Sequence, residues 1–372
     1  MRSRTVAKCN GCGRPSLSSR PPVVRQLLTF VSVLAATSAG AADFNGRARL
    51  WLGPAYDSNA PRDFVSTTVG TQPDVFLFGL AQLEGVLRVG ERFRFLGSYD
   101  LSGRKFITQP REDTLVQAAQ LEGTVAFANS FAIGLAGRAR DRRGAERDYT
   151  DLQGGGVLDF FPSGQVDVRV QVNAHRFWFY NRPDYGFFGP DGTLTARYRF
   201  DRRHALSAFG AYNPRLYDGD ARDRPLPEGT EPPPARQRSD TVFGAGATYS
   251  FRGPFHFSFS YSYFDQTSNS YGESIKRHRL NATGGFRLPW ELTLLTSLTW
   301  QPSIFPEGVF LSPELTVLEE DENVSSLTVK LVKPLGKYVD LDIRYAGFLG
   351  FLPKNDFVYL RHTVSFGVAI NL

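Results

Sequence analysis

The sequence contains little of what soluble enzymes and helical membrane proteins usually rely on. It has one methionine, two cysteines and five histidines in 372 residues. No apolar run reaches the roughly 18 residues that a membrane-spanning helix requires, and the mean hydropathy is −0.26. These absences exclude a bundle of membrane-spanning helices and leave little material for metal or thiol chemistry.

The two cysteines lie near the N-terminus, at Cys9 and Cys12. A lone C-x-x-C pair without a second pair or nearby histidines is weak evidence for a zinc site or a redox pair. The pair also precedes a predicted cleavage site, so the mature chain would contain no cysteine. We therefore expect no disulfide, no metal site and no cofactor.

A targeting segment is indicated at residues 1–42. The apolar run Leu27–Ala36 follows two arginines and precedes Ala39-Gly40-Ala41, a small-x-small cleavage site. We predict a signal peptide with an N-terminal extension over residues 1–42 and a mature domain over residues 43–372. Because the leader is long, a second hypothesis is a non-ATG start near Val23 or Val24, which N-terminal sequencing of the precursor would test.

Aromatic residues make up 13% of the chain and glycine occurs 36 times, which favours β-structure with many turns. The final stretch, Asp356 to Leu372, places apolar residues at every second position from Leu360 onward, with His362 as the one exception. This period of two is typical of a strand with one apolar and one polar face. Because an unpaired strand edge needs cover, we expect Val358–Leu372 to pair with Phe44–Gly53 and close a barrel.

Similar alternation predicts sixteen strands, with fourteen or eighteen as alternatives because residues 302–322 could extend strands or form a hairpin. Seven short turns alternate with longer connections, which is the pattern of an outer-membrane barrel with periplasmic turns and extracellular loops. The predicted strands are Phe44–Gly53, Val75–Val89, Arg92–Gly103, Thr114–Phe127, Phe131–Asp141, Tyr149–Phe161, Gln165–Tyr180, Gly192–Phe200, His204–Tyr212, Asp240–Phe251, Phe255–Asp265, Ser274–Leu288, Glu291–Gln301, Asn323–Lys333, Tyr338–Phe348 and Val358–Leu372.

Aromatic residues gather near both ends of these strands, which predicts the two interfacial bands of a lipid-facing barrel. The alternative is that they are ordinary core aromatics. Examples are Phe44, Phe127, Phe200 and Tyr338 near the short turns and Tyr149, Trp178, Tyr212 and Trp300 near the long loops.

If the apolar face meets lipid, the polar face lines the interior, and there basic residues outnumber acids. An arginine-rich lumen would attract anions and bind carboxylate or phosphate through paired hydrogen bonds. The alternative is that these arginines pair with acids and only stiffen the wall. We also expect a constriction or an inward-folded loop near Trp51 and Phe76. The lumen and anion-path candidates are Arg47, Arg49, Arg94, Arg138, Arg140, Arg169, Arg197, Arg199, Arg279, Arg287, Arg344 and Arg361.

Other functional classes find less support in the sequence. The net charge is +6 and the isoelectric point is near 9.3, but the basic residues alternate along strands and form no patch for nucleic acid. Rim hydrolases on barrels use His with Ser or Asp, and no such pattern is recognisable around His175 or His256. We therefore expect neither an enzyme nor a nucleic-acid-binding protein.

The mature chain resembles Gram-negative outer-membrane β-barrels, both porin-like barrels and export pores for exopolysaccharides. The closing residues resemble the C-terminal signal read by the barrel-assembly machinery, carried here by Ser365, Gly367, Ile370 and Leu372, although an aromatic residue is usual in place of Leu372. The resemblance implies an all-β, transmembrane, antiparallel up-and-down barrel with both termini in the periplasm. Its implied partners are outer-membrane lipid, lipopolysaccharide, the assembly machinery and periplasmic export components.

Two functions follow as hypotheses from the polar inner face and this resemblance. The first is an outer-membrane pore for polar, anionic solutes or a secreted polysaccharide. The second is a structural or adhesive barrel that is plugged by its loops and acts through its long extracellular loops.

Overall fold

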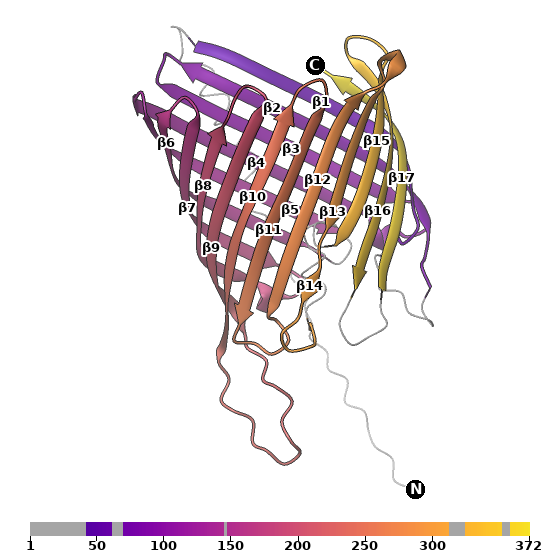
Figure 1. Cartoon of the computed structure of the whole chain (residues 1–372). Helices are drawn as coiled ribbons and strands as arrows, with labels where there is room; N and C mark the ends of the chain where they lie inside the picture. Colours follow the sequence, from indigo (N-terminus) through magenta and orange to yellow (C-terminus); the bar gives the residue numbers. More distant parts are fainter. Residues whose placement is uncertain (1–41, 62–69, 145–146, 312–323, 352–357) are drawn as a thin grey trace, which may run out of the picture. The chain divides into compact units, whose positions relative to one another are not determined.

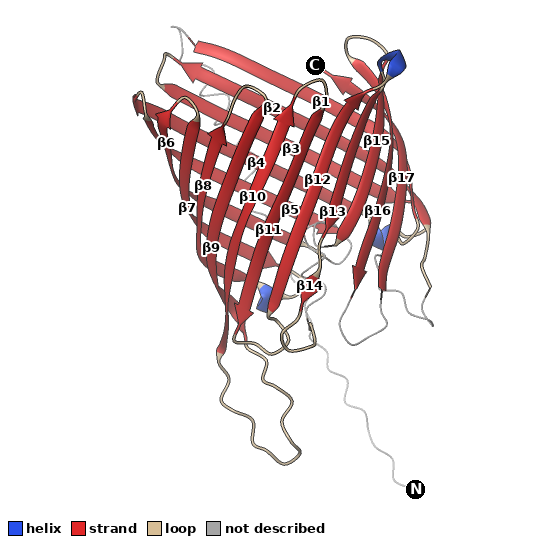
Figure 2. Ribbon diagram, in the orientation of Figure 1, coloured by secondary structure: helices blue, strands red, loops and turns tan. Residues whose placement is uncertain are grey.

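The chain forms one antiparallel sheet that closes on itself (Figures 1 and 2). The structure, a computed structural model, describes residues 42–61, 70–144, 147–311, 324–351 and 358–372. The predicted signal peptide with Cys9 and Cys12 lies outside these residues, apart from Ala42. The hypothesis of a hairpin in 302–322 is only partly covered, because residues 312–322 lie outside the described part.

Neighbouring strands are joined in chain order, and β1 pairs with both β2 and β17. The short β14 continues β13 along β12, because Trp300 pairs with Leu280 and Ser303 with Arg277 in one register. The barrel therefore has sixteen strands, as predicted. The strands are β1 (Ala42–Asp57), β2 (Asp74–Val89), β3 (Phe93–Phe106), β4 (Thr114–Ala128), β5 (Phe131–Gly144), β6 (Tyr149–Ser163), β7 (Val166–Phe179), β8 (Phe187–Arg199), β9 (His204–Asp220), β10 (Gln237–Arg252), β11 (His256–Ser268), β12 (Ile275–Arg287), β13 (Thr293–Trp300), β14 (Ser303–Ile304), β15 (Ser325–Pro334), β16 (Val339–Phe351) and β17 (Val358–Asn371).

Within the described residues, three single 3-10 turns interrupt the all-β architecture, at η1 (Pro110–Glu112), η2 (Pro183–Tyr185) and η3 (Pro289–Glu291). No helix in the described part of the chain is long and apolar enough to cross a membrane.

The seam between β1 and β17 confirms the predicted closure. Leu50 pairs with Ile370 and Leu52 with Val368, and the last residue, Leu372, exchanges backbone hydrogen bonds of 2.8 and 3.0 Å with Ala48. The last residue of the chain is thus bound into the ladder, so neither strand presents a free edge there.

Trp51 lies over Gly367 inside this seam. A Cβ added at position 367 would lie 2.1 Å from the indole ring, which is closer than any side chain tolerates. The Trp51 Nε1–H also donates a 2.7 Å hydrogen bond to the buried Asp342 carboxylate on β16. Glycine at position 367 is therefore needed for the close approach of β1 and β17.

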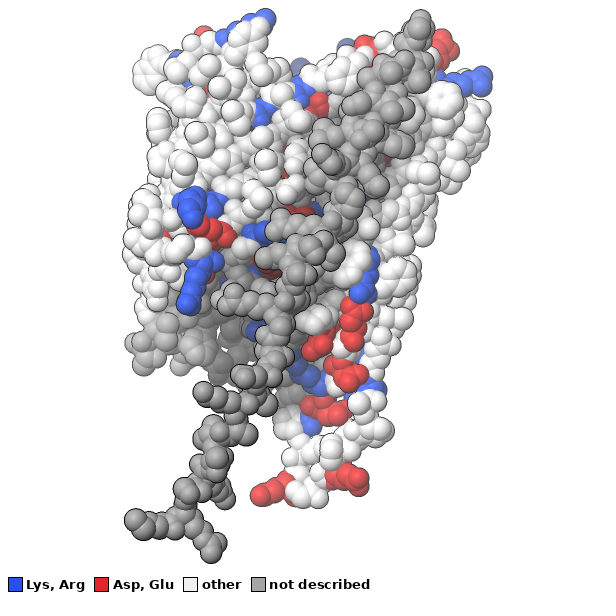
Figure 3. Space-filling view, turned by 180° about the vertical axis from the view of Figure 1, so that it is seen from behind, with Lys and Arg blue, Asp and Glu red and all other residues white. Residues whose placement is uncertain are grey.

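The outer face is apolar, as the alternation predicts. On β17, Val364, Phe366 and Val368 are exposed while Ala369 is fully buried. Seen from behind, most of the outer wall consists of uncharged residues (Figure 3). His362 breaks the apolar series because its Nδ1 lies 2.9 Å from the Tyr345 hydroxyl, so the two outward polar groups satisfy each other.

Aromatic side chains are exposed near both ends of the barrel, Phe127, Phe200 and Tyr338 beside short turns and Trp300 beside a long loop. Tyr149 was expected in the second of these bands, and this expectation is wrong. On β6 the even positions Leu152 and Leu158 face outward, so Tyr149 faces inward, where it is 3% exposed.

All the short turns lie at one end of the barrel, together with the C-terminus (Figure 1). At the turn between β8 and β9, Asp201 accepts backbone hydrogen bonds from Arg203 at 2.6 Å and His204 at 2.7 Å. These two N–H groups favour the charged carboxylate and lower the pKa of Asp201 below its usual value.

Several strands extend past prolines at which the sequence predicted loops. β1 continues through Pro54 to Asp57, and β9 continues through Pro214 to Asp220. Proline cannot donate to the ladder, and the β8–β9 pairing does skip this level between Phe188↔Leu216 and Gly192↔Tyr212. The strands resume because Phe187 and Tyr217 pair beyond the break and pack on the inner face.

Candidate functional site: the inner wall

The strand register places all twelve predicted arginines on the face opposite the exposed apolar side chains. On β5, Ile133 and Leu135 are exposed outward, so Arg138 and Arg140 point inward. The arginines do not converge on one cluster. Arg94, Arg197, Arg199 and Arg287 lie close to short turns, and Arg361 lies toward the long-loop end. They are spread along the whole interior.

Five of the twelve lie beside inward carboxylates. The closest contacts are the short ones from Arg169 to Glu122 and from Arg199 to Asp167. Arg361 is 2.7 Å from Asp57, and both side chains are buried. The remaining two pairs are Arg47–Glu84 at 3.1 Å and Arg49–Asp342 at 3.9 Å. At these positions arginine pairs with an acid of the wall, as the alternative interpretation of the sequence expects.

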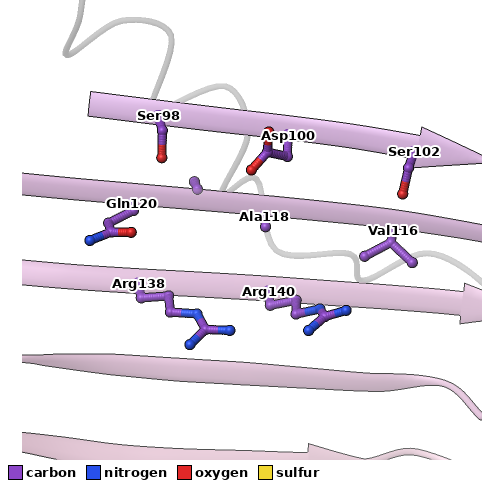
Figure 4. A pocket seen from close by; sticks show the side chains of 9 residues that line it. Ser98, Asp100, Ser102, Val116, Ala118, Gln120, Arg138 and Arg140 are labelled. Atoms are coloured by element: carbon purple, nitrogen blue, oxygen red, sulfur yellow. The ribbon is translucent and has the colours of Figure 1, made fainter. Parts of the chain in front are cut away.

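Other inward arginines are open to solvent. Arg138 and Arg344 point into the barrel away from its ends, yet both are exposed. Figure 4 shows Arg138 and Arg140 side by side on β5, with their guanidinium groups extended in the same direction. They border a hollow of about 320 Å³ whose lining also includes Ser98, Asp100, Ser102, Val116, Ala118, Ala119 and Gln120. This space accommodates water and small polar solutes.

We call the inward side chains of β2–β8 the charged wall. One row of register partners across it is Glu84, Ser98, Gln120, Arg138, Gln153 and His175. The next row toward the long loops is Gln82, Asp100, Ala118, Arg140 and Asp151. Both rows contain acidic and basic side chains beside neutral ones.

The inward side chains of β9–β13 and β15 form a different surface, which we call the hydroxyl wall. One row of register partners is Ser207, Thr248, Ser260, Asn281, Thr299 and Ser326. The adjacent row toward the short turns is Ala205, Ser250, Ser258, Thr283, Ser297 and Thr328. Neither row contains a charged side chain.

The sequence alone does not predict this wall as a surface. Its one signal was the run Ser258-x-Ser260-x-Ser262, which reveals hydroxyls on a single strand. The rows themselves depend on cross-strand register, which the alternation of one strand does not specify.

At the long-loop end, buried charges and aromatics tie several loops together. We call Tyr185, Arg222, Arg238, Asp240 and Glu273 the mouth cluster. Arg238 is 4% exposed, donates to Asp240 at 2.7 and 3.1 Å and lies 3.4 Å from Glu273. Arg222 binds the same Glu273 at 2.8 Å and also contacts the Tyr185 hydroxyl.

Tyr185 packs against an inward cluster formed by Tyr149, Phe177, Phe179, Phe187 and Tyr217. Because Tyr185 belongs to η2, the loop between β7 and β8 folds onto the inner wall. A second inward cluster, near β1, contains Phe76 and Phe106 with Phe78 beside it, and Trp51 contacts Phe78 at 5.1 Å between ring centroids. Aromatic side chains thus line the inner face on two sides of the mouth, and a constriction there stays a prediction.

His175 is the one buried histidine of the described wall, and its partners are structural. Its Nε2 lies 2.8 Å from Asp151 and its Nδ1 3.3 Å from the Asn213 amide. Asp151 lies on the neighbouring strand β6, and Asn213 lies on β9. Among the described residues no group of three or more His, Cys, Asp or Glu could hold a metal ion.

The assembly-signal residues divide between the two faces of β17. Ser365 and Gly367 face inward, while Ile370 and Leu372 face outward and are 39% and 75% exposed. An outward apolar side chain at the barrel rim is accessible to another protein before it meets lipid. Recognition by an assembly machinery stays a prediction.

Comparison with protein-family models and with curated proteins finds no match. Among solved structures, OmpF of Salmonella typhi, in complex with daunomycin, is similar with a TM-score of 0.51 and 11% identity over 88% of this chain and 97% of that one. A bacterial polysaccharide outer membrane secretin gives 0.44 and 10% identity over 87% and 98%. The toluene transporter TbuX of Ralstonia pickettii gives 0.39 and 12% identity over 88% and 89%.

At such low identity these likenesses concern the fold alone. Together with the closed sheet, the likeness to OmpF confirms the resemblance expected from the sequence: the chain has the fold of Gram-negative outer-membrane β-barrels.

Proposed function

We propose that the protein is an outer-membrane channel for polar, anionic solutes, a secreted polysaccharide included. The observation that supports this most strongly is the exposure of Arg138 and Arg344, because both point into the barrel and are still open to solvent. A sixteen-stranded barrel is wide enough for an aqueous channel. Charged side chains inside it would therefore face water.

Whether the channel prefers anions or cations depends on how many inward arginines are paired with acids. Arg169 and Arg199 are compensated by acids. For Arg138 and Arg197 no ion pair with an acid occurs within the described residues. A surplus of fixed positive charge between walls of low dielectric raises the local concentration of anions. We therefore propose a preference for anions over cations.

Reversal potentials in a planar bilayer under a KCl gradient test this proposal. The expected result is a steady conductance with a preference for chloride over potassium, and a smaller preference in the double variant Arg138→Gln, Arg140→Gln. Arg176→Gln is the matched control, because Arg176 faces outward on β7 and pairs with Asp218 at 2.6 Å. A preference for potassium in the unaltered protein would contradict the argument.

The mouth cluster favours a second candidate function, a barrel plugged at its mouth that works through its outer loops. The loop over residues 221–236 extends well beyond the sheet (Figure 1), and β9 with 17 residues is longer than the about 9–11 residues needed to cross the hydrocarbon. A barrel without steady conductance would favour this function over the channel.

The proposed location is the outer membrane, with the short turns and the C-terminus in the periplasm. The outward apolar face would contact lipid, and outward cations near the long loops, such as Arg143 and Arg176, would contact lipopolysaccharide phosphates. The assembly machinery and periplasmic export components remain the proposed partners.

A further inference from the structure

Arg279 is a cation next to the first row of the hydroxyl wall, and the inward position on its other side along β12 is Arg277, which donates to the Ser303 hydroxyl at 3.3 Å. The register partner of Arg279 on β11 is Ser262. On the other side, Leu280 pairs with Trp300, so the next residue, Gln301, lies beside Arg279 on the neighbouring strand. One inward position further along β12 is Asn281, in the first hydroxyl row.

Arg279 and Gln301 share a second property, which is unsatisfied hydrogen-bonding capacity. The Arg279 Nε and the Gln301 Nε2 are buried, and within the described residues neither has a hydrogen-bond partner. Gln301 is 7% exposed, so bulk water does not readily compensate its amide. Buried donors are nearly always paired in folded proteins, and two adjacent ones mark a place where an acceptor is missing.

A row of polarised hydroxyls begins next to these two donors. The Thr299 hydroxyl donates to the Asn281 Oδ1 at 2.8 Å, and the Asn281 amide donates to the Ser260 hydroxyl at 3.3 Å. The Ser260 O–H donates to no acceptor in the described part of the chain, so it can donate to a ligand. Neighbouring strands are about 4.8 Å apart and same-face residues about 6.8 Å apart along a strand, so the patch from Arg279 to this row matches one sugar ring in size.

We propose that Arg279 and Gln301, together with the Ser260–Asn281–Thr299 row, bind an acidic sugar, a carboxylate that carries several hydroxyl groups. This names the solute class of the proposed channel and rests on that function. The carboxylate accepts from the Arg279 guanidinium and from the Gln301 amide, which turns about its side-chain bonds to reach it. The ring hydroxyls exchange hydrogen bonds with the row.

The other wall fits this ligand less well. The hollow beside Arg138 includes the carboxylate of Asp100, which accepts from Gln82 at 3.0 Å and repels a second carboxylate. A neutral sugar at Arg279 would leave the guanidinium without a counter-ion. A simple carboxylate such as acetate would leave the hydroxyl row unused.

Titration calorimetry on the refolded full barrel in detergent tests the site without requiring conductance. The probes are D-glucuronate, D-glucose and acetate. We expect glucuronate to bind at least tenfold more tightly than the other two, because charge-assisted and neutral hydrogen bonds act together only in this ligand. Arg279→Gln should weaken glucuronate binding about tenfold, and Thr299→Val about threefold. The outward Arg176→Gln should leave it unchanged.

Chloride current in a bilayer provides the second measurement, with glucuronate expected to block it at lower concentration than acetate. A barrel that conducts but binds glucuronate and acetate equally overturns the proposed site and leaves the channel standing. Binding without conductance overturns the channel and leaves the site. Undiminished glucuronate binding by Arg279→Gln overturns the assignment to this residue.

Discussion

The charged wall and the hydroxyl wall are built from strands of the same kind and differ in how their polar groups are satisfied. On the charged wall, Arg169 is held by Glu122 and Asp159. On the hydroxyl wall, neutral groups such as Thr299 and Asn281 bind one another. Ion pairs fix side chains in place, whereas neutral hydroxyls exchange partners at low cost. The charged wall thus contributes fixed charges to the interior, whereas the two hydroxyl rows offer replaceable hydrogen bonds.

The largest expected effect concerns the buried pair Arg361–Asp57, which lies at the seam between β17 and β1. Arg361→Met would leave the Asp57 carboxylate buried and unpaired, which costs about 3–5 kcal/mol. We expect a strongly lowered urea midpoint for the barrel refolded in detergent, measured by circular dichroism. The double variant Asp57→Asn, Arg361→Met removes both charges and should recover at least half of the loss. Equal losses in the two variants would show that lost packing, and not an uncompensated charge, is responsible.

A smaller effect is expected when the difference between the walls is removed. Ser258→Arg with Ser297→Arg introduces positive charge into a row that has none. The preference of the channel for chloride over potassium should rise roughly twofold or more, because added cations raise the local anion concentration. The matched variant Ser258→Gln with Ser297→Gln adds volume without charge and should leave the preference unchanged. An equal change in both variants would point to altered pore width.

The smallest effect concerns a single neutral hydrogen bond. Thr299→Val keeps the shape of the side chain and removes the donor to Asn281, which should lower the stability by about 0.5–1.5 kcal/mol. Urea unfolding of the variant beside the unaltered protein measures this difference. A loss as large as that of Arg361→Met would contradict the view that the hydroxyl wall contributes little to rigidity.

The fold could be predicted from the sequence because its signals are local. Period-two alternation, short turns and the apolar end of the chain each depend on neighbouring residues, and they were sufficient for sixteen strands and the closure of β17 on β1. The predicted strands that end before Pro54 and Pro214 are too short. Proline argues locally against a strand, but packing of the residues beyond each proline continues the strand.

The site could be predicted only in part, because its organisation is not local. The inward direction of Arg138 or Arg279 follows from alternation alone. Which arginines are neutralised depends on partners several strands away, as for Arg169 with Glu122. No pattern in the sequence predicts the mouth cluster, because Tyr185, Arg222 and Glu273 come from three separate loop regions.

The seam has a consequence for the order of events in biogenesis. Arg361 and Asp57 are separated by 304 positions, so the contact that closes the barrel forms only after all the strands between them have been made. Until then one edge of β1 lacks its final partner strand, and its unpaired backbone groups can form hydrogen bonds with a strand of another molecule. Contacts between such distant residues also form slowly. Trp51 can pack over Gly367 only when β17 has paired with β1 in the native register. This contact is therefore specific to the closed barrel and is absent from intermediates in which β17 is missing or shifted in register.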